Sequence, residues 1–254
     1  MFFDTHAHYD DKAYDADRDE AIALARDAGA ELIVNCGTDE KASLDSIALA
    51  EKYPFFYAAV GWHPEEAGSF TEESAEQIRA WAKHPRVVAI GEVGLDYHYE
   101  PVDKPLQAAV FVRHMELARE LDLPVIIHDR EAHADVLEIV RQFPEVRGVF
   151  HSFSGSPEMA KIVLELGWYL GFNGVVTFKN AKRAPEVVAM CPADRLLMET
   201  DCPYLTPEPN RGKRNSSAYL TYVAAKMAAI RGVSAEEVYR ITVENGKRLF
   251  SIRD

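Results

Sequence analysis

The sequence has little positive charge and no long apolar run. Its 28 Lys and Arg residues stand against 41 Asp and Glu residues, which gives a formal net charge of −13. This balance argues against a protein that coats long stretches of duplex, because that mode needs many phosphates to be neutralised. A protein that grips one strand end stays possible. No apolar segment approaches the roughly 20 residues of a membrane-spanning helix, and the acidic Asp4 does not suit a signal peptide. We therefore expect no membrane association.

Cysteines are also scarce. The three of them, Cys36, Cys191 and Cys202, form neither a paired metal-binding spacing nor a disulfide framework, so we expect a cytoplasmic protein. Cys202 follows Asp201, but no matching His and Cys motif accompanies it. We interpret Cys202 as a buried residue rather than a nucleophile.

Linkers, low-complexity tracts and internal repeats are absent. With 254 residues, 48% of them apolar, the chain fits one large domain better than two small ones. We therefore expect residues 1–254 to form a single domain. No long coiled-coil seam is visible, so a monomer is the expected state.

Short apolar runs rich in β-branched and aromatic residues alternate with helical patterns. This alternation is typical of parallel strands joined by helices. The eight runs are residues 2–5, 32–35, 55–60, 87–91, 125–127, 148–150, 168–172 and 196–199. Eight strand and helix pairs of this total length predict an α/β fold of the TIM-type (β/α)8 barrel class. An open doubly wound sheet is the alternative, but no glycine-rich phosphate loop follows the first run.

Metal-binding residue types follow five of these runs. In barrel enzymes the chemistry sits at the carboxyl ends of the strands, so these residues are expected to converge on one rim. Two of them are spaced so that both side chains point the same way from an extended chain. The set consists of His6, His8, Glu92, His128, His151 and Asp201.

Such a group of imidazoles and carboxylates is costly to bury without a cation. Nitrogen and carboxylate ligands suit zinc, manganese or iron, whereas magnesium prefers an all-oxygen shell. Six ligands exceed what one catalytic zinc takes from a protein. We therefore predict two divalent metal ions, with Glu92 as the bridge between them.

The residues at these positions resemble the TatD-type deoxyribonuclease family, a branch of the amidohydrolase-like metal-dependent barrels. The resemblance extends along almost the whole chain. It rests on DTHAH at residues 4–8, GWHP at 61–64, GEVGLDY at 91–97, IH at 127–128, FHSFSG at 150–155, ETDCPYL at 199–205 and RGKRN at 211–215.

The resemblance implies that one ion is held by His6, His8, Glu92 and Asp201, and that Glu92, His128 and His151 hold the second. It also implies hydrolysis of DNA phosphodiesters, in some members from a 3′ end, often with magnesium. We expect DNA as the partner, as single strands or 3′ ends. Two departures concern substrate contacts: Glu65 stands where relatives often have a second His, and Ser216-Ser217 stands where Glu-Pro commonly follows Arg-Asn.

The expected mechanism uses a hydroxide that bridges the two ions, with Glu92 and Asp201 as the catalytic residues. Asp201 would accept or return the proton of the attacking water. The expected substrate contacts come from His63 and from a basic loop containing Arg211, Lys213 and Arg214.

Two other functions stay open at this point. One is the hydrolysis of a small phosphoester, lactone or amide by the same metal pair, since one fold hosts many reactions. The other is a binding protein whose metal site is only structural, although structural zinc sites are usually closed. His114 continues the helical stripe of Val110, and we interpret it as a buried structural imidazole.

Overall fold

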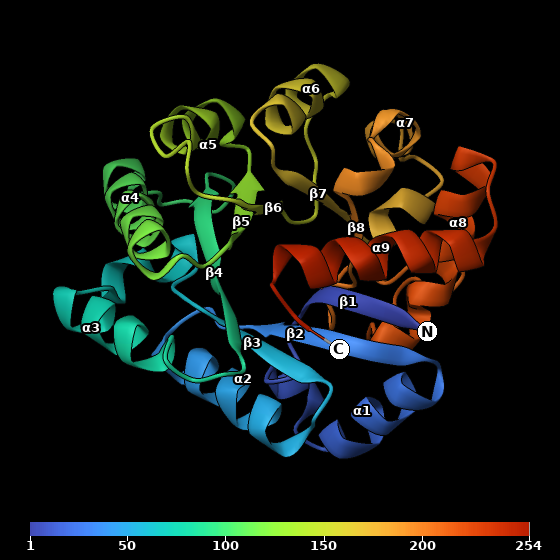
Figure 1. Cartoon of the computed structure of the whole chain (residues 1–254), viewed down its shortest axis with the longest axis horizontal. Helices are drawn as coiled ribbons and strands as arrows, with labels where there is room; N and C mark the ends of the chain where they lie inside the picture. Colours follow the sequence, from blue (N-terminus) through green and yellow to red (C-terminus); the bar gives the residue numbers. More distant parts are fainter. Residues whose placement is uncertain (254) are drawn as a thin grey trace.

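Eight parallel strands lie side by side in the order of the sequence, and helices surround them (Figure 1). The structure is a computed structural model that describes residues 1–253. All eight predicted strands are present. Their bounds are β1 (Phe2–Ala7), β2 (Ala30–Cys36), β3 (Phe56–Val60), β4 (Val87–Asp96), β5 (Val125–Arg130), β6 (Gly148–Phe150), β7 (Tyr169–Phe172) and β8 (Leu196–Met198).

The last strand meets the first just beyond the end of β8. Ala7 forms a parallel bridge with Cys202. The amide of Asp201 donates to the carbonyl of His6 at 2.9 Å, and the amide of His8 donates to the carbonyl of Cys202 at 2.8 Å. These bonds bring β1 and the segment after β8 together, and they confirm the predicted TIM-type barrel.

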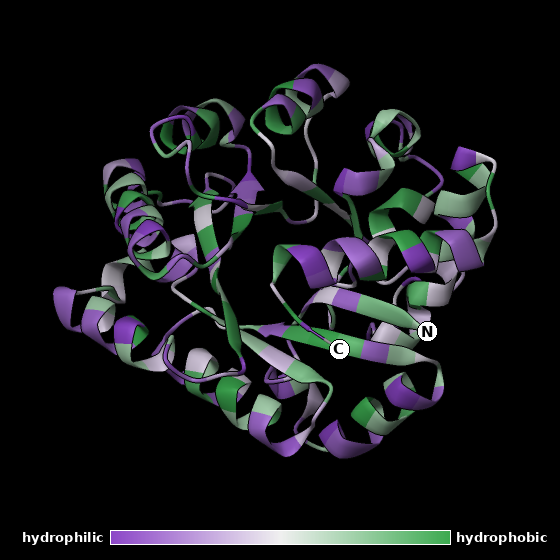
Figure 2. Cartoon of the chain, viewed as in Figure 1, coloured by the Kyte–Doolittle hydropathy of each residue, from purple (hydrophilic) through white to green (hydrophobic). Residues whose placement is uncertain are grey.

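Helices connect successive strands and cover the outside of the sheet. Figure 2 shows that hydrophobic residues are concentrated on the strands and that hydrophilic residues are frequent on the surrounding helices. No helix within residues 1–253 is long and apolar enough to cross a membrane. The helices are α1 (Arg18–Asp27), α2 (Glu40–Lys52), α3 (Glu72–Trp81), α4 (Lys104–Leu121), α5 (His133–Val140), α6 (Pro157–Glu165), α7 (Arg183–Met190), α8 (Leu220–Arg231) and α9 (Ala235–Leu249).

The core has two parts because side chains alternate along each strand. Phe3 and Val34 belong to a cluster inside the barrel, whereas Phe2 and Ile33 pack in the layer beneath the helices. Phe250, at the end of α9, contacts Phe3 with ring centroids 5.9 Å apart. Apolar side chains thus fill the end of the barrel where β1 begins, and the polar residues collect at the opposite end.

Three strands continue past the apolar runs seen in the sequence. β1, β4 and β5 run on to Ala7, Asp96 and Arg130, so several polar residues lie within strands rather than after them. The register shifts between Asp4 and Ala7 in β1, and between Ile90 and Val93 in β4. Such irregularities turn side chains away from strict alternation.

Candidate metal centre

Four donor atoms meet beside β1, and they come from the end of β1, from β4 and from the segment after β8. Nε2 of His6 and Nε2 of His8 lie 2.9 Å apart. Each lies 3.2–3.3 Å from Oε2 of Glu92 and 3.5 Å from Oδ1 of Asp201. A tetrahedral shell with bonds of about 2.0–2.1 Å spaces its donors roughly 3.3 Å apart, so these four atoms have the separation that one cation requires.

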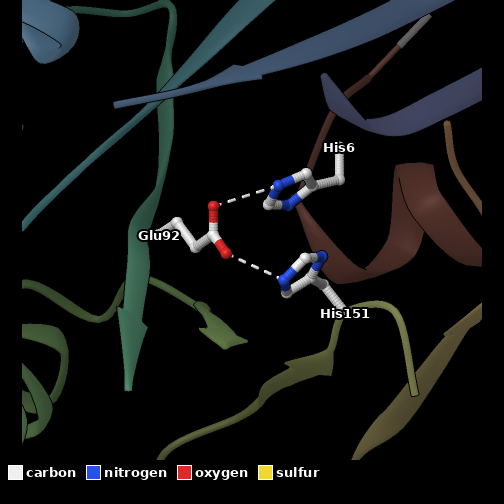
Figure 3. A group of neighbouring side chains, drawn as sticks. All are labelled: His6, Glu92 and His151. Atoms are coloured by element: carbon white, nitrogen blue, oxygen red, sulfur yellow. Dashed lines mark ion pairs between the residues drawn. The ribbon is translucent and has the colours of Figure 1, made fainter. Parts of the chain in front are cut away.

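The other oxygen of Glu92 faces a second set of donors. Oε1 lies 2.7 Å from Nδ1 of His128 and 2.8 Å from Nε2 of His151. Those two nitrogens are 3.3 Å apart. Figure 3 shows the Glu92 carboxylate between His6 and His151, with one oxygen directed to each ring. The arrangement of one carboxylate between two donor sets suits two cations that share Glu92.

When the rings of His8 and His128 are neutral, their outer nitrogens hold the proton and their inner nitrogens carry a lone pair. Nδ1 of His8 donates to the carbonyl of Cys36 at 3.0 Å, and Nε2 of His128 donates to Oδ2 of Asp96 at 2.9 Å. In a neutral imidazole the other nitrogen is then an acceptor. Acceptor nitrogens then face the acceptor oxygens of Glu92. A cation between them would be bound by both and would remove their repulsion. Such outer partners commonly orient histidine ligands of metals.

His151 has an orienting carboxylate as well. Its Nδ1 lies 3.5 Å from Oε1 of Glu199, which also accepts from the amide of Ser152. Within residues 1–253, Oε2 of Glu199 and Nδ1 of His151 are buried without a hydrogen bond of normal length. A proton on Nδ1 would be attracted to Glu199, and that tautomer leaves Nε2 of His151 free for a cation.

The carboxylates of the cluster also favour protons on the imidazoles. Burial lowers the pKa of His8, but hydrogen bonds to Asp201 and Glu92 outweigh burial and raise this pKa well above 6.5. For His151, burial again opposes the charged form, and the attraction of Glu92 and Glu199 raises the pKa well above 6.5. Metal binding at these imidazoles would therefore release protons.

His63 lies at the edge of the same cluster, after β3. Its Nδ1 accepts from the amide of Glu65 at 3.2 Å, so the proton of the neutral ring is on Nε2. That nitrogen lies 3.8 Å from Oε1 of Glu92. Burial and the nearby His128 lower the pKa of His63 to about 3. The ring is thus a neutral N–H donor beside the second donor set.

The basic loop after β8 divides into two parts. The Arg211 guanidinium stacks over Phe178 at 3.7 Å, and Nζ of Lys213 donates to Asn210 at 3.2 Å. Arg214 makes a two-pronged ion pair with Asp17, with both contacts at 2.7 Å. Arg214 is therefore bound to the segment that precedes α1.

Sequence reasoning missed the groups that orient the imidazoles. Asp96 lies in β4 with Glu92, and its carboxylate accepts from Nε2 of His128. No role is predicted for Glu199, which lies beside the His151 ring, or for Asp4, which instead holds Thr200 beside β1. Asp4 accepts from the amide and hydroxyl of Thr200 and from Ser217, and burial raises its pKa to about 7. Only the positions of Asp96 and Glu199 at strand ends, near predicted ligands, could have pointed to these two carboxylates.

Known sequences match the chain along nearly its full length. The sequence profile described as TatD related DNase matches residues 3–251. The "Uncharacterized metal-dependent hydrolase YabD" of Bacillus subtilis is 47% identical over 254 residues, which covers 99% of this chain and 100% of that protein. The "3'-5' ssDNA/RNA exonuclease TatD" of Erwinia tasmaniensis is 34% identical, covering 98% of this chain and 100% of that protein.

A solved structure is similar over the same extent. The crystal structure of YJJV, a TatD homologue from Escherichia coli, superposes with a TM-score of 0.93 at 30% identity, and the match covers 99% of this chain and 98% of that one. Fold and sequence similarity thus agree. The chain belongs to the TatD related DNase family of metal-dependent hydrolases.

Proposed function

We propose that this protein hydrolyses phosphodiester bonds of single-stranded nucleic acid with two divalent cations. The observation that carries the proposal is the division of the Glu92 carboxylate, with Oε2 facing one donor set and Oε1 facing the other. A pair of cations held there would activate a water molecule and stabilise negative charge on the phosphate oxygens. The proposed ligands are His6, His8, Glu92, His128, His151 and Asp201.

Asp201 is the proposed proton acceptor. Its side chain is 15% exposed, whereas that of Glu92 is 4% exposed, so Asp201 is the ligand carboxylate nearer to entering water. A carboxylate in this position can take the proton of the attacking water and return it to the leaving oxygen. Glu92 is the second catalytic residue because it holds both donor sets in place.

The proposed substrate contacts are His63, Arg211 and Lys213. The Nε2–H of His63 is a donor next to the second donor set and can bind a phosphate oxygen. Within residues 1–253, neither Arg211 nor Lys213 forms an ion pair with a carboxylate, so both can meet phosphate. Arg214 is held by its ion pair with Asp17. We propose that it contacts substrate only when this ion pair opens.

The proposed substrate follows from the named relatives. Two TatD proteins that are 34% and 35% identical to this chain are named as 3′–5′ exonucleases of single-stranded DNA and RNA. We infer that the present chain also works from a 3′ end. Four imidazoles and two carboxylates favour zinc or manganese as the resident ion, with magnesium able to support turnover.

The test combines metal analysis with end-labelled substrates. The purified protein is analysed for metal content and then incubated with a single-stranded oligonucleotide that carries either a 3′ or a 5′ label. Manganese, magnesium and zinc are supplied in turn. We expect about two ions per chain at saturation and early release of the 3′ nucleotide. Full metal occupancy without any cleavage of the oligonucleotide would contradict the proposal.

Small substrates serve as the comparison. A generic aryl phosphate diester, a lactone and an amide are assayed on the same metal-loaded sample. Turnover of the lactone or amide but not of either oligonucleotide would assign the metal pair to the other reaction class.

We also propose that the protein acts as a monomer in the cytoplasm. All six proposed ligands come from one chain, so the site needs no partner subunit. The three cysteines are buried and free, which suits a reducing compartment. Light scattering of the metal-loaded protein checks the oligomeric state.

A further inference from the structure

A cavity of about 360 Å³ lies at the carboxyl ends of β6 and β7. It lies between the segment after β6, the segment after β7 and the start of α7. Ser152 lines it and is the next residue after His151, so the cavity begins one residue from a proposed ligand. Its volume lies in the range of pockets that bind small organic groups.

The cavity combines an apolar floor with polar groups at its inner end. Phe153, Phe172 and Val176 are buried and form much of the floor. The Ser152 hydroxyl accepts from Nδ2 of Asn173 at 2.8 Å, and its own proton stays available to a ligand. A flat aromatic base with polar edges is complementary to such a surface, because it buries apolar area and can hydrogen-bond at its rim.

Positive side chains stand at the outer rim. Lys182 and Arg183 line the cavity and are exposed. Within residues 1–253, neither of them forms an ion pair with a carboxylate, although acidic residues outnumber basic ones in the chain. Arg211, in the loop after β8, stacks on Phe178, which follows the cavity residue Val176 by two positions. These cations are available to an anionic ligand at this rim.

We propose that this cavity binds one nucleotide next to the phosphodiester that is cleaved. The base lies on the floor formed by Phe153, Phe172 and Val176, and Lys182 and Arg183 contact the phosphates that flank it. The Ser152 hydroxyl binds the end of the nucleotide nearest the metal ions. This proposal rests on the proposed function, because it assumes that the substrate is a nucleic-acid strand.

The test compares two double variants of equal charge. Lys182→Ala with Arg183→Ala removes two cations from the rim, and Lys161→Ala with Lys226→Ala removes two exposed cations from α6 and α8. Binding of a fluorescent, nuclease-resistant phosphorothioate octanucleotide to the metal-loaded protein is followed by anisotropy at several salt concentrations. This readout does not depend on turnover.

We expect the rim variant to bind the octanucleotide about tenfold more weakly, with a salt slope smaller by about 1.4 for two lost phosphate contacts. The charge-matched control should stay close to the parent in both quantities. Hydrolysis of bis(p-nitrophenyl) phosphate by the charge-matched control should equal that of the parent, which checks that the control keeps an intact metal centre.

A third variant tests the cavity without changing charge. Ala181→Leu fills part of the volume, and we expect weaker binding with an unchanged salt slope. Equal octanucleotide binding by the rim variant and its control would overturn the inference, even if the parent cleaves DNA. If the parent fails to cleave DNA but the rim variant alone loses octanucleotide binding, the result would support the cavity and contradict the proposed function.

Discussion

His128 donates its Nε2–H to Oδ2 of Asp96 across a distance of 2.9 Å. The two residues lie in neighbouring strands, β5 and β4. The carboxylate of Asp96 is held in turn by the amide of His98 at 2.8 Å. This contact selects the tautomer of His128 and directs Nδ1 to Glu92.

Replacing Asp96 by alanine should weaken metal binding at the donor set that contains His128. Loss of an orienting carboxylate lowers metal affinity by about 10- to 100-fold, because the ring is no longer held in one tautomer and orientation. Competition titration with a metal-binding dye measures the affinity of each ion. We expect one ion to bind normally and the other to bind weakly.

Asp135→Ala is the matched control for that substitution, since its carboxylate binds the Tyr97 hydroxyl at an exposed position instead of an imidazole. It should leave both affinities unchanged. Parental affinity for both ions in the Asp96 variant would show that the contact with His128 has no orienting role.

Replacing Glu92 by glutamine should reduce the number of bound ions. The amide is neutral and has one oxygen, so it cannot offer an anionic oxygen to each donor set. We expect the content to fall from about two ions per chain to at most one. Elemental analysis after gel filtration measures this metal content. Glu65→Gln is the control, because Glu65 lies beside His63 at the edge of the cluster.

Asp201→Asn should leave the fold intact and reduce turnover by about 10²- to 10⁴-fold, because the amide cannot accept a proton from water. Its measurement requires a sample with verified metal content and an unchanged melting temperature. Parental turnover in such a sample would remove Asp201 from the proposed proton transfer.

His114 should make stability depend on pH through a path separate from the metal site. The ring is fully buried, donates from Nδ1 to the carbonyl of Val110 at 2.8 Å, and accepts from the Trp62 amide at 3.3 Å. Burial lowers its pKa to about 4. Below pH 6.5 His114 is protonated in the unfolded chain but stays neutral in the folded protein. The free energy of unfolding therefore falls as pH falls towards 4.

Between pH 7.5 and pH 5 this effect amounts to about 2 kcal/mol. His114→Gln can keep both hydrogen bonds and does not titrate. Between pH 7.5 and pH 5 its free energy of unfolding should therefore fall by about 2 kcal/mol less than that of the parent. Urea denaturation of both proteins in chelator measures the difference. An identical pH dependence for parent and variant would contradict the pKa of His114.

Much of the barrel and the set of donor residues could be predicted from the sequence. The eight apolar runs correspond to the eight strands, and parallel strands place their carboxyl ends on one rim. For this reason residues as distant in sequence as His6 and Asp201 could be expected to lie together. His114 was also predicted as a buried structural imidazole, and its burial confirms this.

Only the tertiary structure decided how these groups face one another. The two Glu92 oxygens face donors from distant segments, and the carboxylates beside His128 and His151 come from β4 and from the segment after β8. The pairing of Arg214 with Asp17 joins segments that no local pattern connects. Sequence patterns report the burial and spacing of neighbouring residues, whereas contacts across the barrel depend on register and closure, which the whole chain sets together.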